Sequence, residues 1–216
     1  MSAVRYSFGE QLAHECPPTI GESENILVVP VPDTSVFAAE GYADTLGLRH
    51  GQAIIKDRYS GSGRSFIAAD QRLRQELLKV KHSFLPGKIK GRDIIIIDDS
   101  IVRGNTLPRI VSKIKALGAR SVSCLIASPP VRFPDHYGIN TPAQDELMAA
   151  NLTVAEMQAR CDADYLAFLS LEGMIKATGV PAEKFNLASF NGEYPIDIGQ
   201  KNRNNIRKPV SMQFAA

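Results

Sequence analysis

The sequence lacks tryptophan and has only three cysteines among its 216 residues, Cys16, Cys124 and Cys161. These cysteines are odd in number and far apart, and none has a cysteine or histidine at metal-ligand spacing. The pattern argues against a disulfide framework or a zinc site and indicates a reducing compartment, the cytoplasm. No apolar run is long enough to span a bilayer, and the N-terminus has no apolar signal segment. The net charge of +2 gives no reason to expect nucleic acid or a membrane surface as a partner.

Short apolar runs alternate with helix-like segments along the chain. This β-α alternation predicts an α/β fold with a doubly wound parallel sheet. The length suits a single domain over residues 1–199, and the polar, basic residues 200–216 predict a flexible tail. The predicted strands are 26–31, 53–55, 94–97, 121–127 and 165–169, and the predicted helices are 36–46, 71–81, 107–117, 153–160 and 171–178.

The most informative motif is the stretch from Ile94 to Thr106, IIIIDDSIVRGNT. Its apolar run suits a strand buried on both faces, and open α/β sheets bind ligands at the carboxyl ends of such strands. Asp98 and Asp99 stand at that end, where they can hold ribose hydroxyls or Mg²⁺. A small polar loop and a helix start follow, which offer backbone N–H groups and hydroxyls to a phosphate. The motif therefore predicts a bound sugar phosphate, against the alternative of a strand ending in a solvated acidic turn.

Two further segments contain candidate ligand groups. Asp33, Thr34 and Ser35 follow the first apolar run and can present N–H groups to an anion, although the same residues also suit a helix N-cap. The segment 56–74 is rich in glycine, serine and basic residues. Its cations can fold over a diphosphate and neutralise a leaving group, or they can form a solvated surface loop.

These motifs together resemble the PRPP-binding site of type I phosphoribosyltransferases, where PRPP is 5-phosphoribosyl 1-diphosphate. DDSIVRGNT is similar to one branch, the amidophosphoribosyltransferases of purine biosynthesis, and the resemblance extends from about Val4 to Ile198. It implies a type I phosphoribosyltransferase fold, a central parallel sheet flanked by helices with a mobile lid loop, and Mg²⁺ as cofactor. The PRPP-binding residues it implies are Asp33, Thr34, Ser35, Arg74, Lys81, Asp98, Asp99, Ser100, Ile101, Val102, Arg103, Gly104, Asn105 and Thr106. Thr34, Asp98 and Asp99 match metal positions, and the catalytic set is Lys56, Arg58, Arg64, Asp98 and Asp99.

The sequence also departs from this family. Where this chain has Asn105 the family usually has Thr, and where it has Thr34 the family usually has Ser. The segment between Tyr59 and Arg64, in the lid, is two residues longer here than in the family. Some members hold an iron–sulfur cluster on cysteines, but the three matching positions within this chain are Asp135, Asn186 and Ser189, so no cluster is expected. The glutaminase domain that precedes this region in the family is expected to be absent, so the polypeptide alone should not hydrolyse glutamine.

The expected reaction transfers phosphoribosyl from PRPP to ammonia and yields 5-phosphoribosylamine and pyrophosphate. Three alternatives stay open: ammonia from a separate glutaminase subunit, a different amine or base as acceptor, and a PRPP-sensing regulator. A regulator of this kind usually adds a DNA-binding element, and none is visible before Ile26. The resemblance makes a homo-oligomer plausible. His136 is interpreted as a structural or loop histidine and not as a catalytic base, because no partner carboxylate can be assigned to it.

Overall fold

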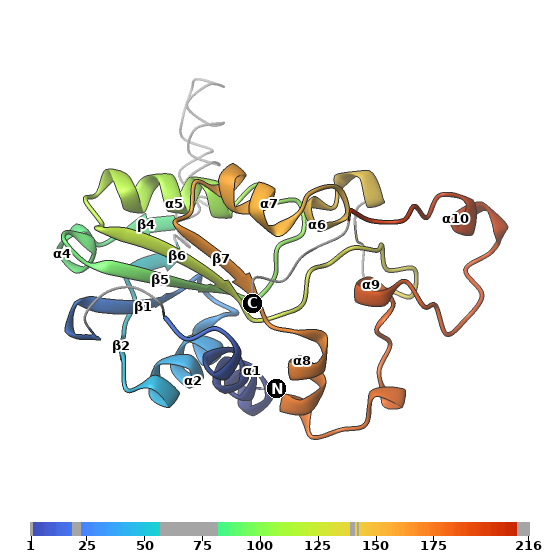
Figure 1. Ribbon diagram of the computed structural model, residues 1–216, viewed down its shortest axis with the longest axis horizontal. Helices are drawn as coiled ribbons and strands as arrows, with labels where there is room; N and C mark the ends of the chain where they lie inside the picture. The colour runs from blue at the N-terminus through green and yellow to red at the C-terminus, as the bar shows by residue number, and fades with distance from the viewer. Residues whose placement is uncertain (1, 19–22, 57–81, 139–140, 142, 211–216) are drawn as a thin grey trace, which may run out of the picture.

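The computed structural model describes residues 2–18, 23–56, 82–138, 141 and 143–210. At its centre is a five-stranded sheet in the order β2-β1-β5-β6-β7, in which every neighbouring pair of strands is parallel (Figure 1). The predicted central parallel sheet is therefore confirmed. The strands are β1 (Ile26–Pro30), β2 (Arg49–His50), β5 (Asp93–Asp98), β6 (Ser121–Ile126) and β7 (Tyr165–Phe168).

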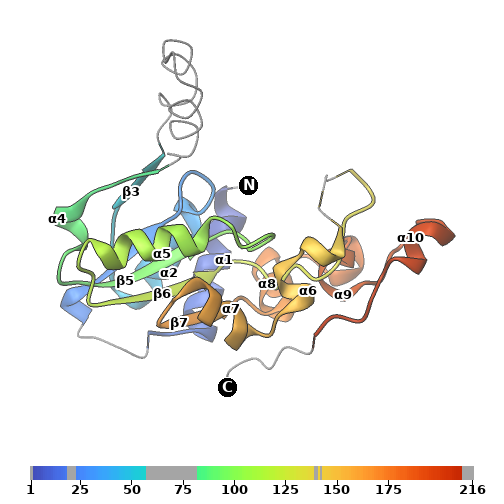
Figure 2. The same cartoon turned by 90° about the horizontal axis from the view of Figure 1, so that it is seen from above.

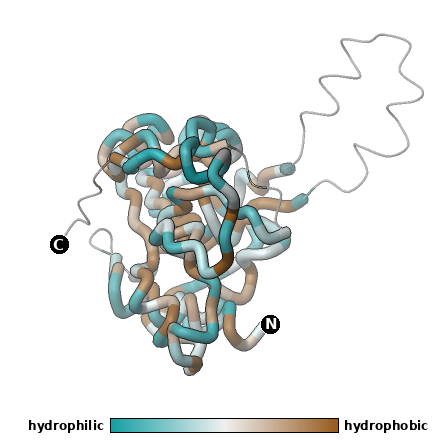
Figure 3. Tube along the Cα trace, turned by 90° about the vertical axis from the view of Figure 1, so that its right-hand side faces the viewer, coloured by the Kyte–Doolittle hydropathy of each residue, from teal (hydrophilic) through white to brown (hydrophobic). Residues whose placement is uncertain are grey.

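Helices cover both faces of this sheet (Figures 1 and 2). Helices α5 (Leu107–Ala116) and α7 (Val154–Cys161) lie on one face, and α1 (Ser2–Glu15), α2 (Val36–Leu46) and α8 (Leu171–Thr178) lie on the other. Alternate residues of β5 serve the two layers: Ile94 and Ile96 pack in one core cluster, and Ile95 and Ile97 pack in the other. This burial on both faces explains why the strand is an unbroken apolar run. The buried apolar residues form one core cluster on each side of the sheet, and Figure 3 shows the hydropathy of each residue along the chain.

Helix α1 was not predicted, because its sequence shows no clear apolar stripe. It packs closely on α2 through two glycines. A Cβ atom on Gly9 would lie 2.0 Å from the carbonyl oxygen of Ala38, and one on Gly41 would lie 2.1 Å from that of Tyr6. Only glycine permits this approach of the two backbones. The tertiary contact, and not local amphipathicity, therefore accounts for the position of α1.

Several local predictions can be compared with the structure. Helix α2 has the predicted bounds and ends at Gly47 with a φ of 64°, and α7 begins with the predicted capping box of Thr153 and Glu156. The strand predicted at 53–55 is β3 (Ile54–Lys56), but it lies outside the main sheet and pairs antiparallel with β4 (His82–Phe84). The predicted strand is therefore present, and it belongs to a separate two-stranded sheet. The helix predicted at 71–81 lies outside the described residues.

Short helical turns fill the connections, and the described part of the tail contains one short helix. Residues Gln200–Asn204 form α10, and the backbone N–H of Val210 donates to the carbonyl of Ala150 at 3.1 Å. The flexibility expected of residues 200–216 stays a prediction.

No helix in the described part of the chain combines the length and apolar character that a membrane span requires. The remaining turns are η1 (Ser23–Asn25), α4 (Pro86–Ile89), η2 (Gln144–Glu146), α6 (Met148–Asn151), η3 (Ala182–Lys184) and α9 (Ala188–Asn191).

Candidate active site

A pocket of about 460 Å³ lies where β1 and β5 end. The two strands are parallel neighbours, with Pro30 paired to Ile97, so the loops that follow them meet at one edge of the sheet. The loop after β1 contributes Thr34, and the end of β5 and the loop after it contribute the whole stretch from Asp98 to Thr106. The structure therefore gathers in one pocket most of the residues predicted to bind a sugar phosphate. Val31, Pro32, His82 and Leu107 also line it and were not predicted.

Asp98 is the buried member of the carboxylate pair, with 9% of its surface exposed. Its Oδ1 accepts a hydrogen bond from the Asp99 N–H at 2.9 Å and from the Ser35 hydroxyl at 3.4 Å. Burial, with a smaller contribution from the charge of Asp99, raises the pKa of Asp98 to about 7, although the two hydrogen bonds oppose the shift. A carboxyl group that titrates near neutrality in a pocket is a typical feature of a functional site.

The loop after β5 presents unpaired backbone donors to the pocket. None of the N–H groups from Ile101 to Thr106 donates to a backbone or side-chain acceptor among the described residues. Thr106 then begins α5 without a side-chain cap, so the positive end of the helix dipole faces the same space. Open N–H groups at a helix N-terminus form a site for phosphate. This loop, residues 100–106, is referred to below as the phosphate loop.

The phosphate loop is held in place by a segment more than forty residues further along the chain. The N–H of Met148 donates to the Val102 carbonyl at 2.9 Å, and Arg103 Nε pairs with Glu146 Oε2 at 2.8 Å. Gly104 has a φ of 66°, and a Cβ atom there would lie 2.1 Å from the Met148 sulfur. Sequence analysis missed Glu146 and Met148 because no local motif marks a contact made only in the folded chain.

Two cations near the pocket are held in weak surface pairs. Lys56 Nζ lies 3.1 Å from Asp33 Oδ2, with both side chains about half exposed, and the Arg103–Glu146 pair is similarly exposed. Exposed ion pairs contribute little to stability, so a phosphate or diphosphate can replace the Asp33 carboxylate beside Lys56 at small cost. The other predicted cations, Arg58, Arg64, Arg74 and Lys81, lie outside the described residues.

The Ser35 side chain lies behind the lining of the pocket. It is completely buried and does not line the pocket. Its hydroxyl does not cap α2 but donates to Asp98 instead. The geometry therefore places Ser35 behind the carboxylate, where it can orient Asp98 without a side-chain contact to a ligand, whereas Thr34 reaches the pocket itself.

The donor set of the pocket fits Mg²⁺. Asp98, Asp99 and Thr34 offer two carboxylates and a hydroxyl, which are the hard oxygen ligands that Mg²⁺ prefers. No group of three His, Cys, Asp or Glu side chains suited to hold a metal occurs among the described residues. Two carboxylates and one hydroxyl supply at most part of the octahedral shell of Mg²⁺, which usually also includes substrate oxygens and water.

The other residues considered from the sequence lie away from this pocket. The His136 ring packs against Tyr194, with ring centroids 5.3 Å apart. Cys124 and Cys161 are buried and free, and burial raises the pKa of both thiols, which suits inert core residues. At two of the positions matched to cluster cysteines, Asp135 accepts from the N–H of Tyr137, and Asn186 accepts from the N–H of Ala188.

Comparisons with known proteins confirm the predicted resemblance. No protein-family model matches the chain. The amidophosphoribosyltransferase of Synechocystis sp. is 42% identical over 194 residues, which are 90% of this chain and 38% of that protein. The Bacillus subtilis amidophosphoribosyltransferase is 39% identical over 202 residues, 92% of this chain and 41% of its own length. The chain therefore spans about two fifths of the length of the curated relatives it matches.

Solved structures show the same correspondence. The B. subtilis glutamine PRPP amidotransferase in complex with ADP and GMP aligns with a TM-score of 0.78 and 38% identity, over 93% of this chain and 44% of that one. A structure described as the allosteric regulatory enzyme of purine biosynthesis aligns with a TM-score of 0.79 at 38% identity, over 93% of this chain and 43% of that one. The predicted fold class, that of type I phosphoribosyltransferases, is confirmed by this similarity.

Proposed function

We propose that this chain, a homologue of amidophosphoribosyltransferases over most of its length, binds PRPP and transfers its phosphoribosyl group to ammonia. The observation that carries the proposal is the composition of one pocket: two carboxylates at the end of β5 and, directly after them, open N–H groups at the start of α5. A sugar that carries a phosphate at one end and hydroxyls at the other matches both parts.

The proposed binding mode assigns each part of PRPP to residues of the pocket. The 5-phosphate accepts hydrogen bonds from the N–H groups and hydroxyls of the phosphate loop. The ribose hydroxyls donate to Asp98 and Asp99. The diphosphate lies toward Thr34 and Lys56, where Lys56 exchanges its weak pair with Asp33 for the phosphate oxygens.

In the proposed reaction, the bond from the anomeric carbon to the diphosphate oxygen breaks, and its electron pair leaves with pyrophosphate. The nitrogen lone pair of ammonia forms the new bond to that carbon, and one proton passes to solvent. Positive charge develops on the sugar between these events, and the carboxylates of Asp98 and Asp99 stabilise it, as carboxylates do in glycoside hydrolysis. Ammonia is already a nucleophile, so the mechanism requires no general base in this chain.

Asp98, Asp99 and Thr34 are the residues proposed to hold Mg²⁺, which supplies charge neutralisation to the diphosphate leaving group when bound. Ser35 fixes the orientation of the buried Asp98 carboxylate through its hydroxyl. The location in the cytoplasm and a homo-oligomeric state stay predictions.

The decisive experiment measures pyrophosphate release from PRPP and Mg²⁺ with ammonium salts and, separately, with glutamine. We expect release with ammonium and its loss in the double variant Asp98→Asn with Asp99→Asn. A matched control, Glu172→Gln on the exposed side of α8, should keep full activity. Full activity of the double variant would refute the assigned roles.

The acceptor is tested in the same assay. Release with glutamine as well would mean that ammonia is generated by the protein used, and would refute the expected lack of glutaminase activity. No release with either nitrogen source, together with PRPP binding by calorimetry, would replace the ammonia reaction with another acceptor or with a PRPP sensor.

A further inference from the structure

A second pocket, of about 550 Å³, lies apart from the carboxylate pair, between two segments distant in sequence. One wall is formed by Pro134, Asp135, His136, Thr141, Ala143, Gln144 and Asp145, and the other by Asn202 and Asn204 of α10 with Asn205, Ile206 and Arg207 after it. The volume of the pocket lies within the range of small-molecule sites.

Buried hydrogen bonds join the two walls. Gln144 is only 5% exposed. Its amide nitrogen donates to the carbonyls of Arg132 and Arg207, at 3.0 and 2.9 Å, and its amide oxygen accepts from the N–H of Arg207 at 2.7 Å. A buried amide with all these partners fixes the backbone of both walls, since leaving any of them unpaired would be costly. The walls of the pocket are therefore held at fixed positions by buried hydrogen bonds, and the pocket is not a gap beside a loose tail.

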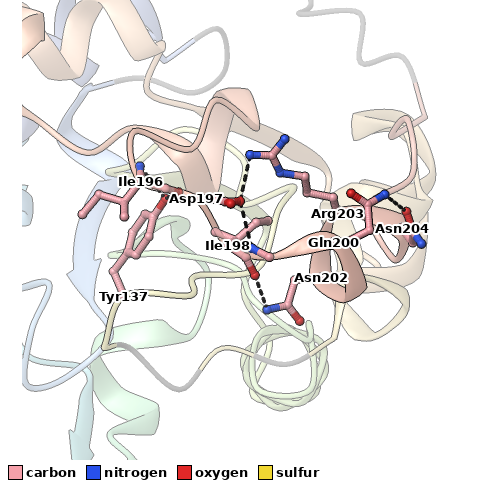
Figure 4. A network of polar contacts seen from close by, with 9 residues as sticks. Tyr137, Ile196, Asp197, Ile198, Gln200, Asn202, Arg203 and Asn204 are labelled. Carbon is pink, nitrogen blue, oxygen red and sulfur yellow. Dashed lines mark hydrogen bonds and ion pairs between the residues drawn. The ribbon is translucent and has the colours of Figure 1, made fainter.

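The segment that leads into the second wall is also ordered by side-chain hydrogen bonds (Figure 4). The Tyr137 hydroxyl donates to the Ile196 carbonyl at 2.6 Å and accepts from the Ile196 N–H at 3.1 Å. Arg203 pairs with Asp197 at 2.8 Å, and Asn202 donates to the Ile198 carbonyl at 2.8 Å. The Tyr137–Ile196 pair ties the stretch that follows Tyr194 to the loop after β6, and the other two contacts order that stretch locally, before the second wall.

Three charged side chains line this pocket, those of Asp135, Asp145 and Arg207. Asp135 is engaged within the protein, because its Oδ1 accepts a hydrogen bond from the Tyr137 N–H at 2.8 Å. The Asp145 carboxylate and the Arg207 guanidinium have no hydrogen-bond or ion-pair partner among the residues that the structure describes. Their backbones lie close, because Arg207 is bonded to Gln144, the residue next to Asp145. The amides of Asn202, Asn204 and Asn205 add donors and acceptors to the lining.

We propose that this second pocket binds a small zwitterion, a free α-amino acid. Its carboxylate would pair with Arg207, whose planar guanidinium suits two-point recognition of a carboxylate. Its ammonium group would pair with Asp145, and the asparagine amides would contact its remaining polar groups. A ligand with both charges satisfies both side chains at once, whereas a simple anion or cation leaves one of them unpaired and opposed.

The second pocket lies outside the proposed catalytic site, but one short turn contacts both this pocket and the phosphate loop. The turn η2 supplies Gln144 to the second pocket and Glu146 to Arg103 of the phosphate loop. A bound amino acid would therefore contact the same short turn that supports the phosphate loop. The proposal itself does not depend on PRPP chemistry, and it is tested by binding alone.

The experiment is isothermal titration of the purified full chain with glycine, L-asparagine and L-glutamate, and with the charge-deleted analogues N-acetylasparagine and asparaginamide. We expect at least one amino acid to bind in the millimolar range or tighter and its analogues to bind at least about tenfold more weakly, as the loss of a charge-assisted hydrogen bond implies. Asp145→Asn and Arg207→Gln should each weaken binding by the same factor. Both side chains are exposed and without partners among the described residues, so neither variant should unfold.

Matched controls separate the pocket from general surface charge. Lys208→Gln, next to Arg207 but outside the lining, and Glu183→Gln on η3 should bind as the unaltered chain does. The proposal would be overturned if no amino acid bound at tens of millimolar. It would equally be overturned if Asp145→Asn and Arg207→Gln left the affinity unchanged, or if the controls weakened binding as much.

Discussion

In the ligand-free protein, the buried carboxyl group of Asp98 should destabilise the fold as the pH rises. The group is almost fully enclosed, and it stands beside a second carboxylate. Its two hydrogen bonds, from Asp99 N–H and Ser35, do not offset the loss of water around a negative charge. Replacing Asp98 with Asn keeps the shape and removes the titration. We therefore expect Asp98→Asn to stabilise the metal-free protein at neutral and alkaline pH.

The magnitude follows from the pKa. The pKa of this carboxyl is about 7 in the folded protein and about 3.9 in an unfolded chain, which corresponds to about 4 kcal/mol in total. Between these two values the folded state holds a proton that the unfolded state has lost. The free energy of unfolding therefore falls as the pH rises through this window, and it levels off above the folded pKa. About 3 kcal/mol of the change should occur between about pH 5 and about pH 8.

The assay is urea unfolding of both proteins across this range, in EDTA and without phosphate. The contributions of all other titrating groups cancel in the difference between the unfolding free energies of Asp98→Asn and the unaltered chain. The pH dependence of that difference therefore reports the titration of Asp98 alone. Asp99→Asn provides the matched control. It removes the smaller of the two causes of the shift, so its own curve should keep a reduced pH dependence.

Parallel stability curves for Asp98→Asn and the unaltered chain would refute the reasoning, because they would mean that Asp98 titrates normally in the fold. The expected result would show that the pocket keeps a carboxylate at a cost in stability. Such a trade is typical of functional sites. The same variant should lose pyrophosphate release, so that the stabilising change and the loss of activity occur together.

Three other contacts give further expected outcomes. Gly104→Ala should weaken PRPP binding by at least about tenfold in a calorimetric titration, since its positive φ and the nearby Met148 sulfur leave no room for a methyl group. Gln144→Ala should lower the unfolding free energy in urea by about 3 kcal/mol, because backbone groups of both walls lose their buried partner. Arg120→Ala should cost about 3 kcal/mol at neutral pH, because it leaves the buried Asp93 without its cation. Pairing with Arg120 lowers the pKa of Asp93, so this deficit should shrink as the pH falls through the carboxylate range.

Each of these variants has a control that the structure supplies. Gly47 has nearly the same φ as Gly104 but open space around it, so Gly47→Ala should strain the backbone without affecting PRPP binding. Gln144→Glu keeps an acceptor for Arg207 and loses the donor, and Arg120→Lys keeps the charge, so both should give intermediate stabilities. Equal PRPP affinity in the two alanine variants would contradict the steric role of Gly104, and a deficit in Arg120→Ala that persists in acid would contradict the ion-pair role of Arg120.

The sequence by itself determined the features that local chain geometry specifies. A strand buried on both faces, the carboxylates at its end, a loop of small residues and a helix start occur together between Ile94 and Leu107. Their relative positions depend on backbone hydrogen bonds a few residues apart, so the pattern could be interpreted directly. The bounds of α2 and the capping box of α7 were predictable for the same reason.

Only the tertiary structure decided which residues distant in sequence contact the segment from Ile94 to Leu107. Ser35 and Asp98 are 63 positions apart, and they meet because β1 and β5 are parallel neighbours whose ends share one edge of the sheet. Glu146 supports Arg103 across 43 positions, and Gln144 fixes Arg207 across 63. Such contacts leave no periodic signal in the sequence, because they depend on how layers pack after the elements have formed. The phosphate loop was therefore visible from the chain alone, while its supports, the burial of Ser35 and the second pocket required the fold.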